Sequence, residues 1–250
     1  NECYVDEFYN QLSSNVWDYN KVIELATPCA EEPVSDAIAQ TMVGEYFFFE
    51  DDGSFTTNKE KLKKAFTLFE KSADQGMDTS SYYLGVMYDD GIYVSRDILL
   101  AKEYYEDAAE LDNAKAQFQL GIIYGDPGFI DKAFGKLSLD YEKAVYWFKK
   151  SAENETPNAT GAYNVSVMYN NGWGVEKNEY TSHVWLKLAA ELGDPDGIIE
   201  WNTLVAGKAL DCSASLNRKK SVIDNFMEEA LLQSQLEKDL AEKRRQDKIS

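Results

Sequence analysis

Small and large apolar residues alternate at helical spacing in four separate segments of this 250-residue chain. In each segment a small residue is followed four positions later by a large apolar residue and eight positions later by alanine. Spacings of four and eight place these residues on one face of a helix, so each segment predicts an amphipathic helix. The aligned residues are Ala65, Phe69 and Ala73; Ala101, Tyr105 and Ala109; Ala144, Phe148 and Ala152; and Ser182, Leu186 and Ala190.

A second apolar pattern precedes each of these helices. It consists of an aliphatic residue, a small residue next to it and an aromatic residue three positions further on. Helix pairs that recur at intervals of 41, 36 and 45 residues predict an α-solenoid. Glycine inside a helix costs up to about 1 kcal/mol, so its use here predicts a close approach of two helices. The aligned residues are Val43, Gly44 and Phe47; Leu84, Gly85 and Tyr88; Leu120, Gly121 and Tyr124; and Val165, Ser166 and Tyr169.

Glycines also mark the turns between the predicted helices. The sequence Gly172-Trp173-Gly174 lies between two helices, whereas a phosphate-binding glycine loop joins a strand to a helix. We therefore expect glycine to supply the positive φ angles of a tight turn at these two positions.

Together the two patterns resemble the Sel-one-like repeat family, α-solenoid relatives of the tetratricopeptide repeat. Residues 80–112 and 161–193 match its pattern best. The resemblance implies an all-α fold, a right-handed α/α solenoid (superhelix) of about four to five helix pairs with a C-terminal capping helix. It assigns structural roles to Gly44, Leu84, Gly85, Tyr88, Gly91, Ala101, Leu120, Gly121, Tyr124, Ala144, Trp147, Ala152, Tyr169, Gly172, Gly174, Trp185 and Ala190.

The same alignment divides the chain into three parts. A degenerate helical pair or cap comes first, repeats follow, and a capping helix with a charged tail comes last. The capping helix is predicted from an apolar stripe that includes Val222, Phe226 and Ala230. The predicted ranges are 1–36 for the first part; 37–207 for the repeats, as 37–76, 80–112, 116–155, 161–193 and a degenerate 197–207; and 208–250 for the last part.

The charge of the chain limits its partners. The formal net charge is −19, and residues 1–58 carry twelve acids against the single base Lys21. Nucleic acid is disfavoured, because binding it depends on cationic side chains. No apolar run approaches the roughly 20 residues of a membrane helix, so no membrane insertion is expected. A partner protein with a basic surface suits this charge.

Residues for catalysis or for metal binding are scarce. His183 is the only histidine, so a nucleophilic centre or a zinc site would lack partners. We predict no enzyme activity, no cofactor and no metal. Cys3 and Cys29 bracket the opening helices, which makes them a candidate disulfide of an oxidising compartment; unpaired thiols are the alternative.

The resemblance implies a non-enzymatic protein–protein interaction module that binds its partner on a concave face. The candidates for partner binding are of three kinds: residues beside the consensus positions of the first helices, acidic residues, and a tryptophan in a turn. For the aromatic ones, packing between repeats is the alternative. The candidates are Glu45, Phe48, Phe49, Asp51, Asp52, Tyr82, Tyr83, Asp89, Asp90, Phe118, Gln119, Tyr163 and Trp173.

Within that class, the chain is similar to bacterial immunity proteins that neutralise phospholipase toxins of type VI secretion by occlusion. This similarity predicts a periplasmic or secreted protein after signal-peptide removal, with a toxin or effector as its partner. The alternative is a scaffold or adaptor in envelope assembly, signalling or host interaction. A remote alternative is a hydrolase of envelope polymers.

Overall fold

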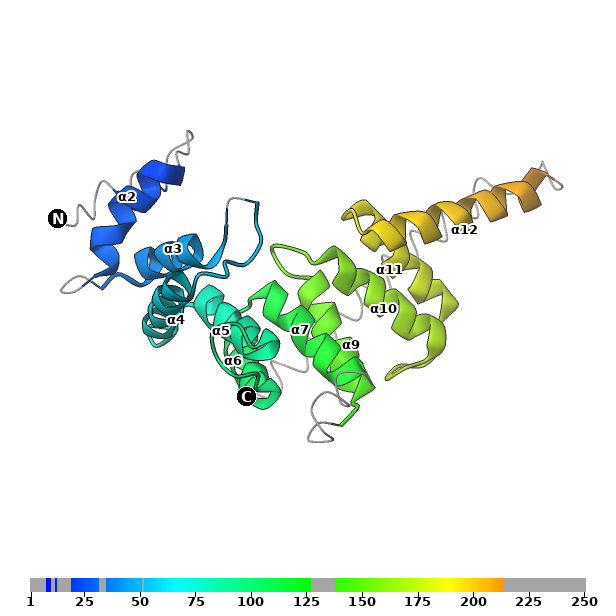
Figure 1. Cartoon of the computed structure of the whole chain (residues 1–250). Coiled ribbons are helices and arrows are strands. Elements are labelled where there is room, and N and C mark those ends of the chain that lie inside the picture. Colours follow the sequence, from blue (N-terminus) through cyan, green and yellow to red (C-terminus); the bar gives the residue numbers. More distant parts are fainter. Residues whose placement is uncertain are drawn as a thin grey trace, which may run out of the picture. The chain divides into compact units, whose positions relative to one another are not determined.

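Every regular element in the described part of the chain is an α-helix, which confirms the all-α prediction (Figure 1). Strand-like pairing among the described residues is limited to one isolated bridge between Phe49 and Phe55. The chain divides into two compact units, residues 1–139 and 140–250. The computed structural model describes residues 8–9, 12, 19–31, 35–50, 52–126 and 138–213, with side chains up to residue 206.

The first unit is a run of helices in which each packs against the next along the chain. This nearest-neighbour packing is the pattern of a solenoid, and α3 with α4 and α5 with α6 form successive pairs. The helices are α2 (Tyr19–Ala30), α3 (Ala37–Phe48), α4 (Lys59–Ala73), α5 (Asp78–Asp90), α6 (Ile98–Glu110) and α7 (Ala114–Gly125).

The second unit continues the same pattern with α9 (Tyr141–Ala152), α10 (Ala159–Asn171), α11 (Glu179–Glu191) and α12 (Pro195–Ser213). The degenerate first helix predicted at 197–207 lies inside α12, which is longer at both ends. The predicted capping helix and tail fall almost wholly on residues 214–250, outside the described residues.

Most first helices of the pairs begin at an Asp or Asn whose side chain caps them. The side chains of Asp36, Asn113 and Asn158 accept a hydrogen bond from the backbone N–H three residues further on. Such caps satisfy backbone donors that have no partner inside the helix. Asn113 also donates to Asp78 at 2.8 Å, which ties the start of α7 to the start of α5.

Glycine permits the close contact inside a pair that the sequence predicts. A Cβ atom on Gly85 would lie 2.6 Å from two ring carbons of Tyr105, and one on Gly44 would lie 2.6 Å from the ring of Phe69. Both rings are buried. In the second unit, Gly172 ends α10 with φ of 75°, the left-handed conformation expected for the turn.

The N-terminal helices enclose a small core of their own. Phe8, Val22 and Cys29 are fully buried there, together with residues of α3. Cys29 is disulfide-bonded. Its predicted partner, Cys3, lies outside the described residues, so the pairing stays a prediction.

Candidate functional site

Two aromatic candidates for partner binding belong to the core instead. Phe48 and Tyr83 are buried, and the ring of each contacts the ring of Phe69 at 5.7 Å and 5.1 Å between centroids. The prediction that these side chains face a partner is wrong. The physical reason is that α3 and α5 are enclosed by α4 as well as by each other's rings, so more than the consensus stripe is covered.

Other candidates in the first unit are half-buried and join neighbouring first helices. The Tyr83 hydroxyl donates to the Glu45 carboxylate, and burial raises the pKa of that carboxyl. Gln119 hydrogen-bonds to the hydroxyl of Tyr82, while the Lys115 ammonium lies 5.8 Å from the centre of the Tyr82 ring. For these residues, packing between repeats describes the contacts. Phe49 and Phe118 are likewise only half-exposed.

The acidic candidates differ in their surroundings. Asp52 is exposed and accepts hydrogen bonds from the backbone and hydroxyl of Ser54, which hold the pKa of its carboxyl below the usual value. Asp89 pairs with Arg96 at 3.3 Å, and Asp90 is exposed. Asp51 lies outside the described residues. These acids belong to separate turns and make no common site in the structure.

Trp173 is the exposed candidate of the second unit. Its indole stacks on Tyr141 with 5.6 Å between ring centroids, at an interplanar angle of 15°. The contact fastens the α10–α11 turn to the start of α9. One face of the ring is therefore used inside the protein, while much of the side chain remains exposed.

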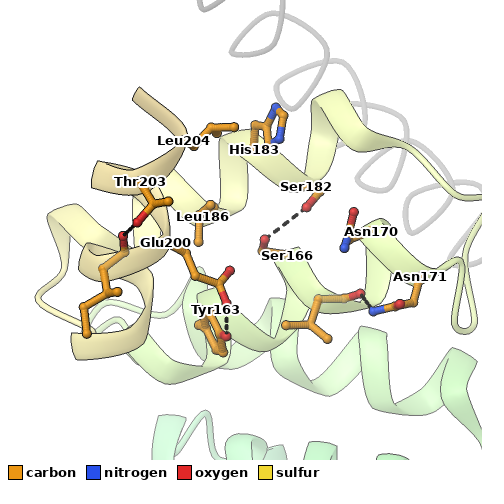
Figure 2. A pocket seen from close by; sticks show the side chains of 12 residues that line it. Tyr163, Ser166, Asn170, Asn171, Ser182, His183, Leu186, Glu200, Thr203 and Leu204 are labelled. Carbon is orange, nitrogen blue, oxygen red and sulfur yellow. Dashed lines mark hydrogen bonds between the residues drawn. The ribbon is translucent and has the colours of Figure 1, made fainter. Parts of the chain in front are cut away.

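The second unit contains a pocket of about 580 Å³ between α10, α11 and α12 (Figure 2). Its lining mixes hydroxyls, amides, one carboxylate and aliphatic side chains. The lining residues are Tyr163, Ser166, Val167, Asn170, Asn171, Ser182, His183, Leu186, Ile199, Glu200, Thr203 and Leu204.

One wall of the pocket is closed by a hydrogen bond between two helices. The Tyr163 hydroxyl of α10 donates to the Glu200 carboxylate of α12 at 2.7 Å (Figure 2). Burial and then this carboxylate raise the pKa of Tyr163 to about 12, so the phenol remains a neutral donor. Tyr163 is thus the one aromatic candidate from the sequence that lines the pocket. Glu200 was missed.

The opposite wall is polar, and several of its groups are held by hydrogen bonds within the protein. The hydroxyls of Ser166 and Ser182 lie 3.1 Å apart, and the Asn171 amide donates to the carbonyl of Val167. His183 reaches the pocket from α11, with Nε2 3.8 Å from the Glu179 carboxylate, beyond hydrogen-bond distance. Hydrogen bonding and apolar contact are what these groups offer to a ligand.

Two further findings bear on function. Within the part of the chain that the structure describes, no cluster of three His, Cys, Asp or Glu side chains is arranged to hold a metal ion. None of the described helices combines the length and the apolarity that crossing a membrane requires.

The comparison with protein families accounts for these helix pairs. The family model described as Sel1 repeat matches residues 37–77, 79–113, 114–155 and 159–194. The chain belongs to the Sel1 repeat family. Each match contains one pair of helices in order, beginning at α3, α5, α7 and α10. The resemblance noted in the sequence is thereby confirmed, and so is the repeat solenoid.

Relatives of known structure share this fold. A Sel1 repeat protein from Oxalobacter formigenes is 21% identical, with a TM-score of 0.61 over 80% of this chain and 74% of that one. A protective antigen of uropathogenic Escherichia coli with an SLR fold is 24% identical, with a TM-score of 0.61 over 79% of this chain and 39% of that one. At these identities the likeness shows the fold alone.

Among curated proteins, a component of an ERAD-associated E3 ubiquitin-protein ligase, HRD3B of Arabidopsis thaliana, is 30% identical over 130 residues. The match covers 48% of this chain and 19% of that protein, so the chain spans a small part of its length. Sel1 repeats mediate protein–protein interactions, and the family is mainly an interaction scaffold.

Proposed function

We propose that this Sel1 repeat protein is a non-enzymatic scaffold that binds a basic segment of a partner protein in the pocket between α10, α11 and α12. The observation that carries the proposal is the Glu200 carboxylate, held at the pocket wall by the Tyr163 hydroxyl. An ionised carboxylate offers about four acceptor sites, and Tyr163 occupies one of them. The others suit a lysine or arginine side chain.

The rest of the lining supports a peptide-like ligand. Ile199 is 63% exposed beside Glu200 on α12 and can cover the methylene groups of a long basic side chain. Asn170 is exposed on α10 and carries both a donor and an acceptor for a peptide backbone. The net charge of −19 favours approach of a basic partner at low ionic strength.

The test selects binding sequences directly, so it can be carried out before the partner is identified. A library of random twelve-residue peptides displayed on phage is selected against the purified protein, and bound sequences are read. We expect enrichment of Lys or Arg beside apolar residues. Enrichment of acidic sequences, or selected peptides that bind a Glu200→Gln variant as well as wild type, would overturn the proposal.

The expected loss of affinity follows from the strength of a hydrogen bond between the Glu200 carboxylate and a basic side chain. A hydrogen bond to a charged group contributes about 1.5–3 kcal/mol, so Glu200→Gln should weaken a selected peptide roughly tenfold to a hundredfold. Glu155→Gln is the matched control, because Glu155 is an exposed carboxyl in the α9–α10 connection and does not line the pocket. Isothermal titration calorimetry with one selected peptide measures both variants.

A narrower form of the proposal is that the partner is a secreted toxin and that this chain is its periplasmic immunity protein. The acidity of the chain and the disulfide at Cys29 support an oxidising compartment and a basic partner. Co-expression with the neighbouring gene product, exported to the periplasm of a test bacterium, decides it. Protection that is lost with Glu200→Gln supports the immunity role, whereas binding without protection supports a scaffold in a larger assembly.

A further inference from the structure

In the third and fourth pairs, a lysine of the preceding second helix lies over the consensus aromatic ring of the first helix. The Lys102 ammonium of α6 lies 5.6 Å from the centre of the Tyr124 ring. The Lys149 ammonium of α9 lies 5.0 Å from the centre of the Tyr169 ring and donates to its hydroxyl at 2.7 Å. A cation this close to a ring is attracted by the negative face of the π-system. The chain therefore supplies its own cation to the consensus ring in these two pairs.

The second pair lacks this lysine. Its consensus ring is Tyr88 of α5, and the preceding second helix is α4. When the second helices are aligned on their first small residue, Phe66 of α4 takes the position of Lys102, and Glu70 takes that of Lys149. Among the described residues, no lysine or arginine lies over the Tyr88 ring. An aromatic ring and an acid thus replace the cation of the neighbouring pairs.

Further aromatic rings gather around Tyr88. The ring of Phe66 lies 6.1 Å from that of Tyr88 and 5.5 Å from that of Tyr93, between centroids. On the other side, Tyr104 of α6 stacks on Tyr88 with 5.6 Å between centroids and 10° between the ring planes. Tyr93 is 44% exposed and the other three side chains are half-buried. We call the rings of Phe66, Tyr88, Tyr93 and Tyr104 the aromatic patch.

Tyr93 is in a strained backbone conformation. Its φ is 68°, and the equivalent residue in the turn of the fourth pair is Gly174, with φ of 70°. A bulky residue rarely adopts this left-handed conformation, because its Cβ meets the neighbouring backbone. Such strain is concentrated at functional sites. A tyrosine in place of glycine therefore indicates that this exposed ring has a role on the surface.

Acidic side chains lie around the patch. Burial and then the charges of Glu70 and Asp97 raise the pKa of the Tyr88 hydroxyl. Burial and then the charge of Asp74 raise the pKa of the Glu70 carboxyl, although Glu70 is exposed. The acids thus repel one another and disfavour further negative charge. A cation placed against the rings would be attracted by the aromatic faces and by these carboxylates together.

We propose that the aromatic patch and Glu70 bind an arginine side chain of a partner protein, at a second site in the first unit. Arginine fits better than lysine, because its planar guanidinium stacks on an aromatic face and can pair with a carboxylate at the same time. The site lies on α4, α5 and α6 and includes no residue of the pocket between α10, α11 and α12. It therefore does not depend on what that pocket binds.

Nuclear magnetic resonance of the full chain tests the site with a small probe. N-acetyl-arginine amide is titrated into the ¹⁵N-labelled protein, and N-acetyl-citrulline amide, whose side chain has nearly the same shape without the charge, is the control probe. We expect the arginine probe alone to shift the amide signals of residues 88–97. Equal shifts with citrulline would overturn the proposal. Shifts confined to the lining of the pocket would also overturn it, while supporting a basic ligand there.

Two variants assign the binding to its groups. Tyr93→Gly removes the exposed ring and introduces the residue that the fourth pair has at this place in the turn, so the fold is retained. Glu70→Gln removes the carboxylate. Each should raise the dissociation constant of the arginine probe about threefold or more. Glu176→Gln, at an exposed carboxyl in the α10–α11 turn, makes the same change of charge and should leave it unchanged. Wild-type affinity in both Tyr93→Gly and Glu70→Gln would overturn the proposal.

Discussion

Replacing Gly85 with serine tests whether steric contact within a pair sets the sequence of the repeat. The new Cβ would lie 2.6 Å from Cδ1 and Cε1 of Tyr105 and 3.2 Å from its Cγ. Carbon atoms in contact are usually about 3.5–4.0 Å apart, so the ring must move by roughly 1 Å. Tyr105 is 1% exposed and has no free space to enter.

The expected loss of stability is the difference between a packing cost and a gain in helix propensity. Overpacking a core costs about 1–3 kcal/mol, and replacing glycine in a helix with serine returns about 0.5 kcal/mol of propensity. We therefore expect Gly85→Ser to lower the free energy of unfolding by about 1–2 kcal/mol.

In the fourth helix pair of this chain, a serine replaces the glycine and a smaller side chain replaces the tyrosine ring. In the fourth pair, Ser166 stands where the second pair has Gly85, and Leu186 stands where it has Tyr105. Tyr105→Leu alone should cost about 1–3 kcal/mol because it leaves a cavity. In that background Gly85→Ser should be neutral or slightly stabilising, which gives a coupling energy of about 1–2 kcal/mol.

Urea unfolding followed by circular dichroism at 222 nm measures all four members of this cycle. Equal m-values among them would show that the same cooperative unit unfolds in each. Strict additivity of the two substitutions would refute the reasoning, since it would mean that the serine and the tyrosine ring do not compete for space. A Gly85→Ser variant as stable as wild type would refute it as well.

Two further predictions concern Tyr163 and Cys29. Tyr163→Phe should lower stability by about 1 kcal/mol at pH 7 through loss of the bond to Glu200. Because the pKa of Tyr163 is raised to about 12 from 10.0, this advantage of wild type is complete below pH 10 and declines towards pH 12. Urea titrations at several pH values check this, and an undiminished difference at pH 12 would contradict it. Thiol titration in denaturant should find one free thiol before reduction and three afterwards; three before reduction would exclude the disulfide.

The repeat could be predicted from the sequence because each consensus residue has a steric reason that recurs. Gly44 and Gly85 lie where an aromatic ring of the second helix crosses the first helix. The two rings, Phe69 and Tyr105, occupy the same position in their helices. A constraint that appears at every repeat leaves a periodic signal, and periodicity is what a single sequence reveals.

The exposure of the flanking residues could not be predicted in the same way. A first helix contacts its own second helix and also neighbouring pairs, so the consensus stripe marks only part of its buried surface. Phe48 and Tyr83 lie beside the stripe and are nevertheless buried, because they fill space against each other and Phe69. Side chains from different repeats meet there, and spacing within one helix carries no information about such contacts.

Glu200 was missed for a different reason, although the sequence contains a usable signal. The apolar pattern of α12 is too irregular to fix its register, but Asp194 lies at the place where Asn158 begins the preceding first helix. Counting from Asp194 would have given Glu200 the position that Gln119, a candidate for partner binding, holds after Asn113. Caps can therefore align a degenerate repeat when its core positions no longer can.

The pocket lies at the helix pair whose side chains depart from the consensus in size. Buried aromatic rings occupy one position of the second helix in the first three pairs, at Phe69, Tyr105 and Phe148, whereas the smaller Leu186 lines the pocket in the fourth. One of the Ser166 and Ser182 hydroxyls donates to the other at its edge, so each of these buried groups has a partner in the polar site. The consensus residues hold each pair together, and the space for a ligand opens where the chain replaces them. We therefore expect a ligand-binding site in such a solenoid at the helix pair whose residues occupy the consensus positions but have smaller side chains.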